Sequence, residues 1–532
     1  MAEWWAQGLH WLQQQQQHQE HSQAALVSVL LVVPLVVLLL VRRITTADAR
    51  AREQQLNKLP SPPGLPVIGH LHLVGSLPHI SVRELAAKHG RDGILLLRLG
   101  SVPSIVISSA AAAEAVLRTH DHVFASRNRS TVTEILFYGS SDVAFAPHGE
   151  HWRQVKKIST THLLSNKKVR SYRGAREQEV RLVMAHILEA ALAGTTFDLS
   201  TMFYSFLNNI ICHAVFGRFF KEGGRGRNKI FQELVEQNAL LLGGFNIEDY
   251  FPNLVRLNIV KRLVCAKIHK VHKMWDDLLN KLIEEHEIKP ASQVDTEESD
   301  FIDVLLSIQQ EYQLTKDHIK AQLVVMFQGG IDTASGVLDY AMVKLMQNPH
   351  LLTKLQNEVR MVVPPGKEMV TEDDLDGMAY LKAVVKETLR LHGPAPFLLP
   401  HFSMADCVIE GYTIPSGIRI IINSMAISRD PNYWESAEEF IPERFMEGGS
   451  AAALDYKGND YVFVPFGSGR RKCPGINFAI PTVELMLANL MYHFNWELTP
   501  ESAKNGIDMT ESFGATVHRI KSLVLAPVLP QN

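Results

Sequence analysis

The segment 466–475, with the sequence FGSGRRKCPG, constrains this chain more than any other feature of its sequence. It presents one cysteine, Cys473, on a glycine-rich turn that opens a helix. Gly467 and Gly469 allow the backbone to approach a flat ligand and aim N–H groups at the sulfur. Pro474 lacks an N–H and suits the first helical position, so a helix dipole would favour the thiolate of Cys473. A buried, unreactive cysteine is the alternative, but this spacing favours a ligand loop.

The same ten residues match the pattern Phe-x-x-Gly-x-Arg-x-Cys-x-Gly at every fixed position. At this point the chain resembles the cytochrome P450 monooxygenases. A thiolate ligand pushes electron density onto haem iron and favours cleavage of the O–O bond. The resemblance therefore implies haem b as the cofactor, Cys473 as the axial iron ligand and O2 as co-substrate. It also implies haem contacts from Phe466, Gly467, Gly469, Arg471 and Gly475, with Arg471 pairing with a propionate.

The composition of the chain excludes some classes of protein. Its 532 residues are 46% apolar, which allows a large core, and the net charge of −3 offers no global basic surface for nucleic acid. The four cysteines, Cys212, Cys265, Cys407 and Cys473, show no Cys-x-x-Cys pair and no disulfide framework. A reducing compartment is therefore expected for the catalytic body.

The segment 24–41 is apolar except for Ser28 and Pro34, and its 18 residues would span roughly 27 Å as a helix, enough for a thin bilayer. A cleaved signal peptide is the alternative, but residues 1–23 contain no Lys or Arg. Basic residues follow the span instead, which predicts a cytosolic body. We therefore expect a single-pass protein of the endoplasmic reticulum, with a tail, anchor and linker over 1–59 and the catalytic domain over 60–532.

The rest of the chain predicts a mainly α body with a small β portion, in agreement with the cytochrome P450 fold that the resemblance implies. Strands are expected over 93–99 and 102–109, and hairpins over 407–424. Residues 150–360 are mostly helical in character, with a loop-like break at 289–300. The proline-rich segment 60–69 is similar to the hinge of microsomal members of the family.

The sequence Gly329-Gly-Ile-Asp332-Thr333 interrupts an apolar helical run. Two glycines and a threonine weaken the hydrogen-bond ladder of a buried helix, so we expect a local bulge. By resemblance, Asp332 and Thr333 are the acid and alcohol that relay protons to iron-bound oxygen. The alternative is a close helix contact at the glycines with a capping aspartate. Ala334 stands where related plant enzymes usually carry Thr or Ser.

Two charged residues of one helix face, Glu387 and Arg390, are separated by three positions. Alone this pair is a weak signal, but Pro442-Glu-Arg444-Phe matches the family segment whose arginine completes a buried network. The resemblance implies that Glu387, Arg390 and Arg444 brace the cysteine loop without taking part in the chemistry.

Other candidate haem contacts depart from the family pattern. Trp152 and Lys156 occupy the positions of Trp-x-x-x-Arg, where lysine keeps the charge but loses the bidentate fork. His401 stands where many relatives have an arginine for a propionate, with a surface histidine as the alternative. Pro481 falls within the helix expected after Cys473, where an interior proline costs roughly 3 kcal/mol.

Several segments most resemble the grass enzymes that oxidise indole-derived intermediates in benzoxazinoid synthesis, among them 242–251, 275–279 and 401–406. The implied substrate is small and aromatic, such as indolin-2-one or a benzoxazinone. Terpenoids, fatty acids and xenobiotics such as herbicides are alternative substrates, and a P450-fold isomerase, a dehydratase and a non-catalytic haem protein are remoter alternatives. The implied partners are a separate NADPH reductase, cytochrome b5 and the bilayer. Candidate substrate contacts are Ile135, Leu136, Phe137, Met326, Phe327, Phe397, Leu398, Phe513 and Val517.

Overall fold

The computed structural model describes residues 47–530, apart from 224, 245, 254–257 and 289–298. The chain divides into two compact units, Met1–Lys58 and Leu59–Asn532. In the first unit the described part contains the helix α2 (Ala47–Leu56). The apolar segment 24–41 lies outside the described residues, as does most of the loop expected at 289–300.

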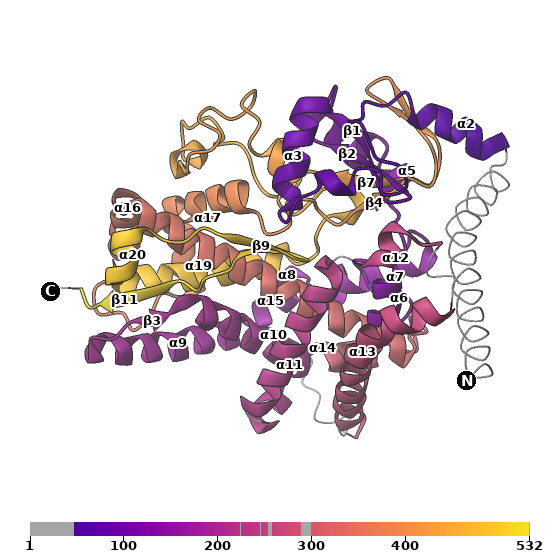
Figure 1. The fold of residues 1–532 in the computed structure, drawn as a ribbon. Coiled ribbons are helices and arrows are strands. Elements are labelled where there is room, and N and C mark those ends of the chain that lie inside the picture. The colour runs from indigo at the N-terminus through magenta and orange to yellow at the C-terminus, as the bar shows by residue number, and fades with distance from the viewer. Residues whose placement is uncertain (1–46, 224, 245, 254–257, 289–298, 531–532) are drawn as a thin grey trace, which may run out of the picture. The chain divides into compact units, whose positions relative to one another are not determined.

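The second unit is mostly helical (Figure 1), which confirms the predicted fold class. Its longer helices are α3 (Pro78–His89), α7 (Glu150–Ile158), α9 (Arg173–Ala193), α10 (Leu199–Gly223), α11 (Arg225–Gly243), α13 (Asn258–Glu287), α15 (Lys316–Gln347), α16 (Pro349–Val362), α17 (Ala379–His392) and α19 (Ile476–His493). The shorter ones are η1 (Leu71–Leu73), α4 (Ala110–Glu114), η2 (Ala115–Thr119), α5 (Asp121–Phe124), α6 (Thr131–Leu136), η3 (Ser159–Leu163), α8 (Asn166–Ser171), α12 (Ile247–Tyr250), α14 (Phe301–Ser307), η6 (Glu372–Gly377), α18 (Ser424–Ile427), η7 (Pro442–Phe445), η8 (Gly469–Arg471) and α20 (Pro500–Asn505).

The strands form small sheets, and those expected over 93–99, 102–109 and 407–424 are present, whereas β3, β4 and the strands after residue 494 were not predicted. They are β1 (Ile94–Leu99), β2 (Val102–Ile107), β3 (Phe197–Asp198), β4 (His401–Phe402), β5 (Cys407–Ile409), β6 (Tyr412–Ile414), β7 (Arg419–Ile422), β8 (Asn495–Leu498), β9 (Glu511–Phe513), β10 (Val517–Arg519) and β11 (Val524–Val528). The largest sheet has the order β1-β2-β7-β4, with β2 and β7 parallel, and β3-β11-β8 forms a second sheet. The pairs β5-β6 and β9-β10 are antiparallel hairpins. Glu410 and Gly411 both have positive φ, of 48° and 81°, as the tight turn of the predicted β5-β6 hairpin requires.

The core is built around α15, which packs against α10, α17 and α19 (Figure 1). The Thr315 hydroxyl caps its N-terminus by accepting a hydrogen bond from the His318 N–H at 3.1 Å. Apolar side chains are buried on most sides of the helix, as expected for a helix enclosed by others. Among the described residues, one helical segment, Leu199–Gly217 in α10, is apolar and long enough to cross a membrane, but most of it is buried in this core.

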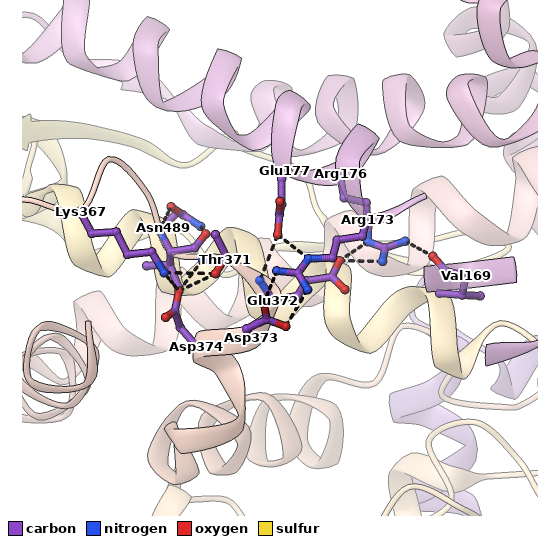
Figure 2. Close-up of polar contacts among 11 residues, drawn as sticks. Val169, Arg173, Arg176, Glu177, Lys367, Thr371, Glu372, Asp373, Asp374 and Asn489 are labelled. Atoms are coloured by element: carbon purple, nitrogen blue, oxygen red, sulfur yellow. Dashed lines mark hydrogen bonds and ion pairs between the residues drawn. The ribbon is translucent and has the colours of Figure 1, made fainter. Parts of the chain in front are cut away.

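An ionic network joins α9 to the segment before α17 (Figure 2). Arg173 binds Asp373 through two hydrogen bonds of 2.6 and 2.8 Å, and the Arg176 Nε donates to Glu372 at 2.6 Å. Arg176 is fully buried and its guanidinium lies 5.8 Å from the ring of Phe478 on α19. The network therefore fixes α9 beside α19, the helix that follows Cys473.

Candidate functional site

The backbone of the cysteine loop requires its glycines. Gly467 and Gly469 have φ of 66° and 64°, a region that favours glycine. A Cβ on Gly469 would lie 2.2 Å from the Leu117 carbonyl oxygen, so the loop also needs the missing side chain for close packing. The Cys473 N–H donates to the Phe466 carbonyl at 2.9 Å and closes the loop.

The cysteine sulfur accepts a hydrogen bond from the Gly475 N–H at 3.4 Å. The Cys473 side chain is exposed in this structure. Partial desolvation raises the pKa of its thiol, while the hydrogen bond from Gly475 and the charges of Lys156 and Lys472 act to lower it. The helix begins at Ile476 rather than at Pro474, so the predicted helical position of Pro474 is wrong by two residues.

Two arginines and a lysine are held close to Cys473 by backbone carbonyls. The Lys156 ammonium donates to the Lys472 carbonyl at 2.6 Å. Arg471 donates to the carbonyls of Ala125 and Ala146, each at 2.6 Å, and its guanidinium lies 4.1 Å from the ring centre of Trp152. Arg127 donates to the carbonyls of Leu399, Pro400 and Ala144.

Burial lowers the pKa of each of these cations, to about 9 for Arg127 and about 8 for Arg471 and Lys156. Arg127 and Arg471 also repel each other. The carboxylate that attracts both arginines is Asp142, whose own pKa burial raises to about 6. The surplus of positive charge fits the two propionates of haem, and the cysteine beside it fits the haem iron.

The remaining predicted haem contacts bond to the backbone in this structure. The Trp152 indole N–H donates to the Val143 carbonyl at 3.1 Å. His401 is 5% exposed, so the alternative of a surface histidine is wrong, and its Nδ1 bonds to the Phe124 carbonyl at 2.8 Å. Burial holds the pKa of His401 well below its usual value, so the ring is a neutral hydrogen-bonding group.

The segment Gly329–Thr333 lies in the middle of α15, which stays α-helical throughout. The expected bulge is therefore wrong. The Thr333 hydroxyl donates to the Gly329 carbonyl at 2.7 Å, one turn earlier on the same helix. Gly329 is exposed within this buried helix and no atom lies within 4 Å of the place where its Cβ would be. Gly330 instead packs against Ile211 of α10.

Asp332 lies among polar groups from α10, α11 and its own helix. Burial, and then the charge of Glu236, raise its pKa to about 7. The Gln328 amide donates to its carboxylate at 3.2 Å. The Tyr204 hydroxyl interacts with the same carboxylate, but it does not reach hydrogen-bond geometry in this structure. A carboxyl group with a pKa near neutrality can both take up and release a proton.

The predicted network of Glu387, Arg390 and Arg444 is present. Arg390 and Glu387 are fully buried and joined by two hydrogen bonds of 2.7 and 2.8 Å, and Arg444 approaches the same carboxylate at 3.4 Å. The Arg390 guanidinium stacks 5.0 Å from the Trp434 ring, which contacts Phe463 just before the cysteine loop. The contacts thus run from the network to the loop.

The candidate substrate residues divide into two groups. Leu136, Phe137 and Phe327 have no exposed surface, and Phe327 packs between Phe231 and Trp275. These three pack within the hydrophobic core of this structure. The others keep some accessible surface: Ile135, Met326, Phe397, Leu398, Phe513 and Val517. Leu398 lies near the cysteine loop, 3.8 Å from the Cβ position of Gly467, and Phe397 meets Phe513 edge to face.

Some residues of the site were not predicted. The segment 124–127 resembles plant members of the family, but nothing in the sequence assigned Arg127 to the site, because its partners lie at Ala144, Leu399 and Pro400. Tyr204 and Glu236 reach Asp332 from other helices, so no local spacing identifies them. Pro481 lies within α19 as predicted, and the helix continues through it.

Comparison with known proteins agrees with this geometry. The cytochrome P450 family model matches residues 59–524. Three maize proteins are similar over most of their length. Indole-2-monooxygenase is 52% identical, with 90% of this chain and 89% of that protein covered. The 3-hydroxyindolin-2-one monooxygenase is 53% identical with 89% of each chain covered, and indolin-2-one monooxygenase is 51% identical with 91% of each covered.

Solved structures share the fold at lower identity. A zebrafish cytochrome P450 with progesterone matches with a TM-score of 0.70 at 24% identity, covering 85% of this chain and 99% of that one. Members of the family bind haem through a cysteine thiolate, use O2 and receive electrons from NADPH through a reductase. The loop, the helix and these similarities together show that the chain belongs to the cytochrome P450 family of haem-dependent monooxygenases.

Proposed function

We propose that this chain inserts one atom of O2 into an indole-derived intermediate of benzoxazinoid synthesis, while the other atom leaves as water. The observation that carries the proposal is the similarity, at 51–53% identity, to three maize enzymes whose names specify oxidation of indole or indolin-2-one compounds. Relatives on one fold differ in substrate. Terpenoids, fatty acids and xenobiotics are therefore alternative substrates, which the experiment below compares with the indole compounds.

Cys473 is the proposed iron ligand. Haem bound through a thiolate supplies electron density that favours cleavage of the O–O bond. The Gly475 N–H on the sulfur stabilises its negative charge. Lys156 holds the loop through the Lys472 carbonyl, and Arg127, Arg471, Trp152 and His401 are the proposed contacts for the propionates. Phe466, Gly467 and Gly469 shape the loop against the ring.

Asp332 and Thr333 are the proposed proton carriers. Because the pKa of Asp332 is about 7, its carboxyl is partly protonated at neutral pH. The Thr333 hydroxyl donates to the Gly329 carbonyl, and it would donate to oxygen if haem bound beside this open stretch of α15, where no atom lies within 4 Å of the Gly329 Cβ position. Deprotonated Asp332 then takes up a proton from solvent through its polar neighbours.

The proposed substrate site is apolar and partly aromatic. Ile135, Met326, Phe397, Leu398, Phe513 and Val517 contribute to it. Flat rings of about ten atoms suit such a lining, because aromatic side chains pack edge to face against them. The edge-to-face pair of Phe397 and Phe513 would give one wall.

The proposed arrangement of the chain in the cell follows from its first residues. Residues 1–59 would be tail, anchor and linker in the endoplasmic reticulum membrane, and 60–532 the cytosolic catalytic domain. Lys472 and Arg470, the latter already paired with Asp121, are the proposed basic contacts for the acidic face of the reductase. Cytochrome b5 is a further candidate electron donor.

The test is to incubate membranes that contain the protein, reductase and NADPH with indole, indolin-2-one, 3-hydroxyindolin-2-one and matched terpenoid and fatty-acid substrates. Hydroxylated indole derivatives, absent without NADPH, are the expected result. Product only from the terpenoid or fatty-acid compounds would refute the substrate assignment. NADPH oxidation without any product would also refute it, although it would agree with the activity of the family. Cys473→Ser is the negative control.

A further inference from the structure

One turn of the backbone, residues 142–146, supplies the acceptors for three side chains that are proposed to contact haem. Its carbonyls accept four hydrogen bonds of 2.6–3.4 Å: Trp152 to Val143, Arg471 to Val143 and to Ala146, and Arg127 to Ala144. Both guanidinium groups and the indole are therefore oriented by the same five residues. A change in the shape of this turn would move all three donors together.

The side chain of Asp142 gives the turn its shape. Its Oδ1 accepts hydrogen bonds from the Ala144 N–H at 2.7 Å and from the Phe145 N–H at 3.0 Å. Its carbonyl accepts from the Ala146 N–H at 3.2 Å and closes the turn. An aspartate that binds backbone N–H groups two and three residues ahead forms an Asx turn, which fixes the backbone without help from a helix or a sheet.

The two side-chain bonds also decide where the carbonyls point. The peptide bonds of this turn are trans, and in a planar trans peptide the N–H and the C=O point in opposite directions. Because the N–H groups of Ala144 and Phe145 point to Asp142, the carbonyls of Val143 and Ala144 point away from it. They meet the indole and the guanidinium groups there. The carboxylate therefore aims two of the three acceptors.

Asp142 also brings a negative charge into a group of cations. The residue is 0% exposed, and its second oxygen, Oδ2, has no hydrogen-bond partner among the described residues. Its charge acts to raise the pKa of both Arg127 and Arg471, against the effect of burial. Burial raises the pKa of Asp142 itself to about 6, so the carboxylate is mostly ionised at pH 8.

A purely structural turn does not need this charge. An asparagine would accept the same two backbone hydrogen bonds through its Oδ1. Burial of a charged group costs free energy unless opposite charges compensate it. The ionised side chain with a free Oδ2 is therefore explained by Arg127 and Arg471 rather than by the turn alone.

We propose that Asp142 is a positioning residue of the haem site. Its side chain aims the carbonyls of the turn at Trp152, Arg127 and Arg471, and its charge offsets part of the positive potential that the two arginines impose on haem. The inference rests on haem bound through Cys473, as proposed above. Reduction of the iron adds one electron, so a fixed negative charge nearby disfavours it.

The first test separates the shape of the turn from its charge, with full-length protein loaded with haem. Asp142→Ala removes the acceptor, so haem should pass to an acceptor protein about tenfold faster. Asp142→Asn keeps the acceptor at Oδ1 and breaks no hydrogen bond at Oδ2, so its release rate should stay within about twofold of the wild type. Wild-type release from Asp142→Ala would overturn the positioning role, as would equally fast release from both variants.

The second test measures the reduction potential of the haem at pH 8 without substrate. Asp142→Asn removes a negative charge, so the potential should become more positive. A tenfold change in the ratio of reduced to oxidised haem corresponds to about 59 mV for one electron. A side chain that only shaped the turn would not change the potential when haem is retained. An unchanged potential in Asp142→Asn would therefore overturn the role of the charge.

Asp508 provides the matched controls. Its Oδ1 also accepts from a backbone N–H two residues ahead, that of Thr510 at 2.8 Å, but the side chain is 33% exposed and pairs with Lys521. Asp508→Ala and Asp508→Asn should leave haem release and potential unchanged. Equally fast haem release from Asp508→Ala and Asp142→Ala would show general destabilisation and overturn the positioning role.

These measurements also separate the inference from the proposed reaction. If the wild type takes up no haem, the cofactor assignment fails and the role of Asp142 fails with it. If the wild type holds haem but converts no indole compound, only the substrate assignment fails. Haem release and the reduction potential still decide the role of Asp142, because neither measurement needs a substrate.

Discussion

The two sides of the site are built differently. On the cysteine side, Cys473, Lys156 and Arg471 bond to backbone carbonyls and amides of nearby loops. On the α15 side, Asp332 and Thr333 lie on one continuous helix, and the groups around Asp332 come from α10 and α11. On the cysteine side, charged side chains are held in place by several hydrogen bonds to the backbone. On the α15 side, a helix surface carries a few side chains that can exchange protons.

This difference has a physical cause. A metal ligand must be held in one place, so the loop uses positive φ at glycines, a close approach to Leu117 and a buried ion-pair network behind it. A proton carrier must gain and lose its charge, so Asp332 has a neutral amide, Gln328, as its hydrogen-bond donor, and the nearby charge of Glu236 raises its pKa rather than fixing it as an anion. Variants on the cysteine side should therefore change cofactor binding, and variants on α15 should change coupling.

The largest effect is expected for Cys473→Ser. The variant removes the proposed thiolate ligand, so the carbon monoxide difference band typical of haem-thiolate proteins should vanish together with product formation. Cys407→Ser, at a half-buried cysteine of β5, is the matched control and should leave both unchanged. A normal band in Cys473→Ser would show that Cys473 is not the iron ligand, and the contrast between the two sides of the site would then fail.

The next effect concerns the support behind the loop. Glu387→Gln leaves Arg390 and Arg444 buried without a countercharge, which should cost about 3–5 kcal/mol in the free energy of unfolding. Asp373→Asn breaks the exposed pair with Arg173 of Figure 2 and should change the free energy of unfolding far less, because solvent screens an exposed pair. Urea unfolding measures both. Equal costs would mean that the buried network is no stronger than a surface pair.

The two sides also differ in how far the sequence predicts them. Cys473, its glycines and the Glu387–Arg390 pair are local patterns, and the structure agrees with them except for the start of the helix after Pro474. The bulge at Gly329 was expected from helix propensity, but packing around α15 and the Thr333 hydroxyl keep the helix regular. Phe327 was assigned to the substrate because it is aromatic and near Gly329, yet its direction on the helix points it into the core. Partners from distant segments, such as Tyr204 for Asp332, leave no local signal.

Asp332→Asn should test the α15 side. It keeps the shape of the side chain but cannot carry a proton, so product formation should fall by a factor of about 10² while haem binding stays normal.

The raised pKa of Asp332 also predicts an effect on stability. Because the folded pKa of about 7 exceeds that of the unfolded chain, folding takes up a proton between about pH 4 and 7. The contribution of Asp332 to the free energy of unfolding is therefore fully present below about pH 4 and is lost as the pH rises to 7.

Asp332→Asn should accordingly be more stable than the wild type at pH 8 and should show a flatter dependence of unfolding free energy on pH. Thermal melts at pH 5 and pH 8 measure the difference. Asp339→Asn, on the same face of α15, is the control for a buried carboxylate in an ion pair and should lose stability at pH 8. If both variants lose stability at pH 8, Asp332 is ionised and paired rather than a proton carrier.

The smallest effect is expected for Lys156, which links the haem contacts to the cysteine loop. Lys156→Met removes the charged hydrogen bond to the Lys472 carbonyl and should cost about 1.5 kcal/mol, seen as roughly tenfold faster release of haem to an acceptor protein. Lys156→Arg restores the cation and should retain haem at least as well as the wild type. Lys157→Met is the matched control, since this neighbouring lysine is exposed and contacts Tyr312 instead. Slow haem release in Lys156→Met would show that the backbone of the loop holds Cys473 without the lysine, because Gly467, Gly469 and the Cys473 N–H already define its shape.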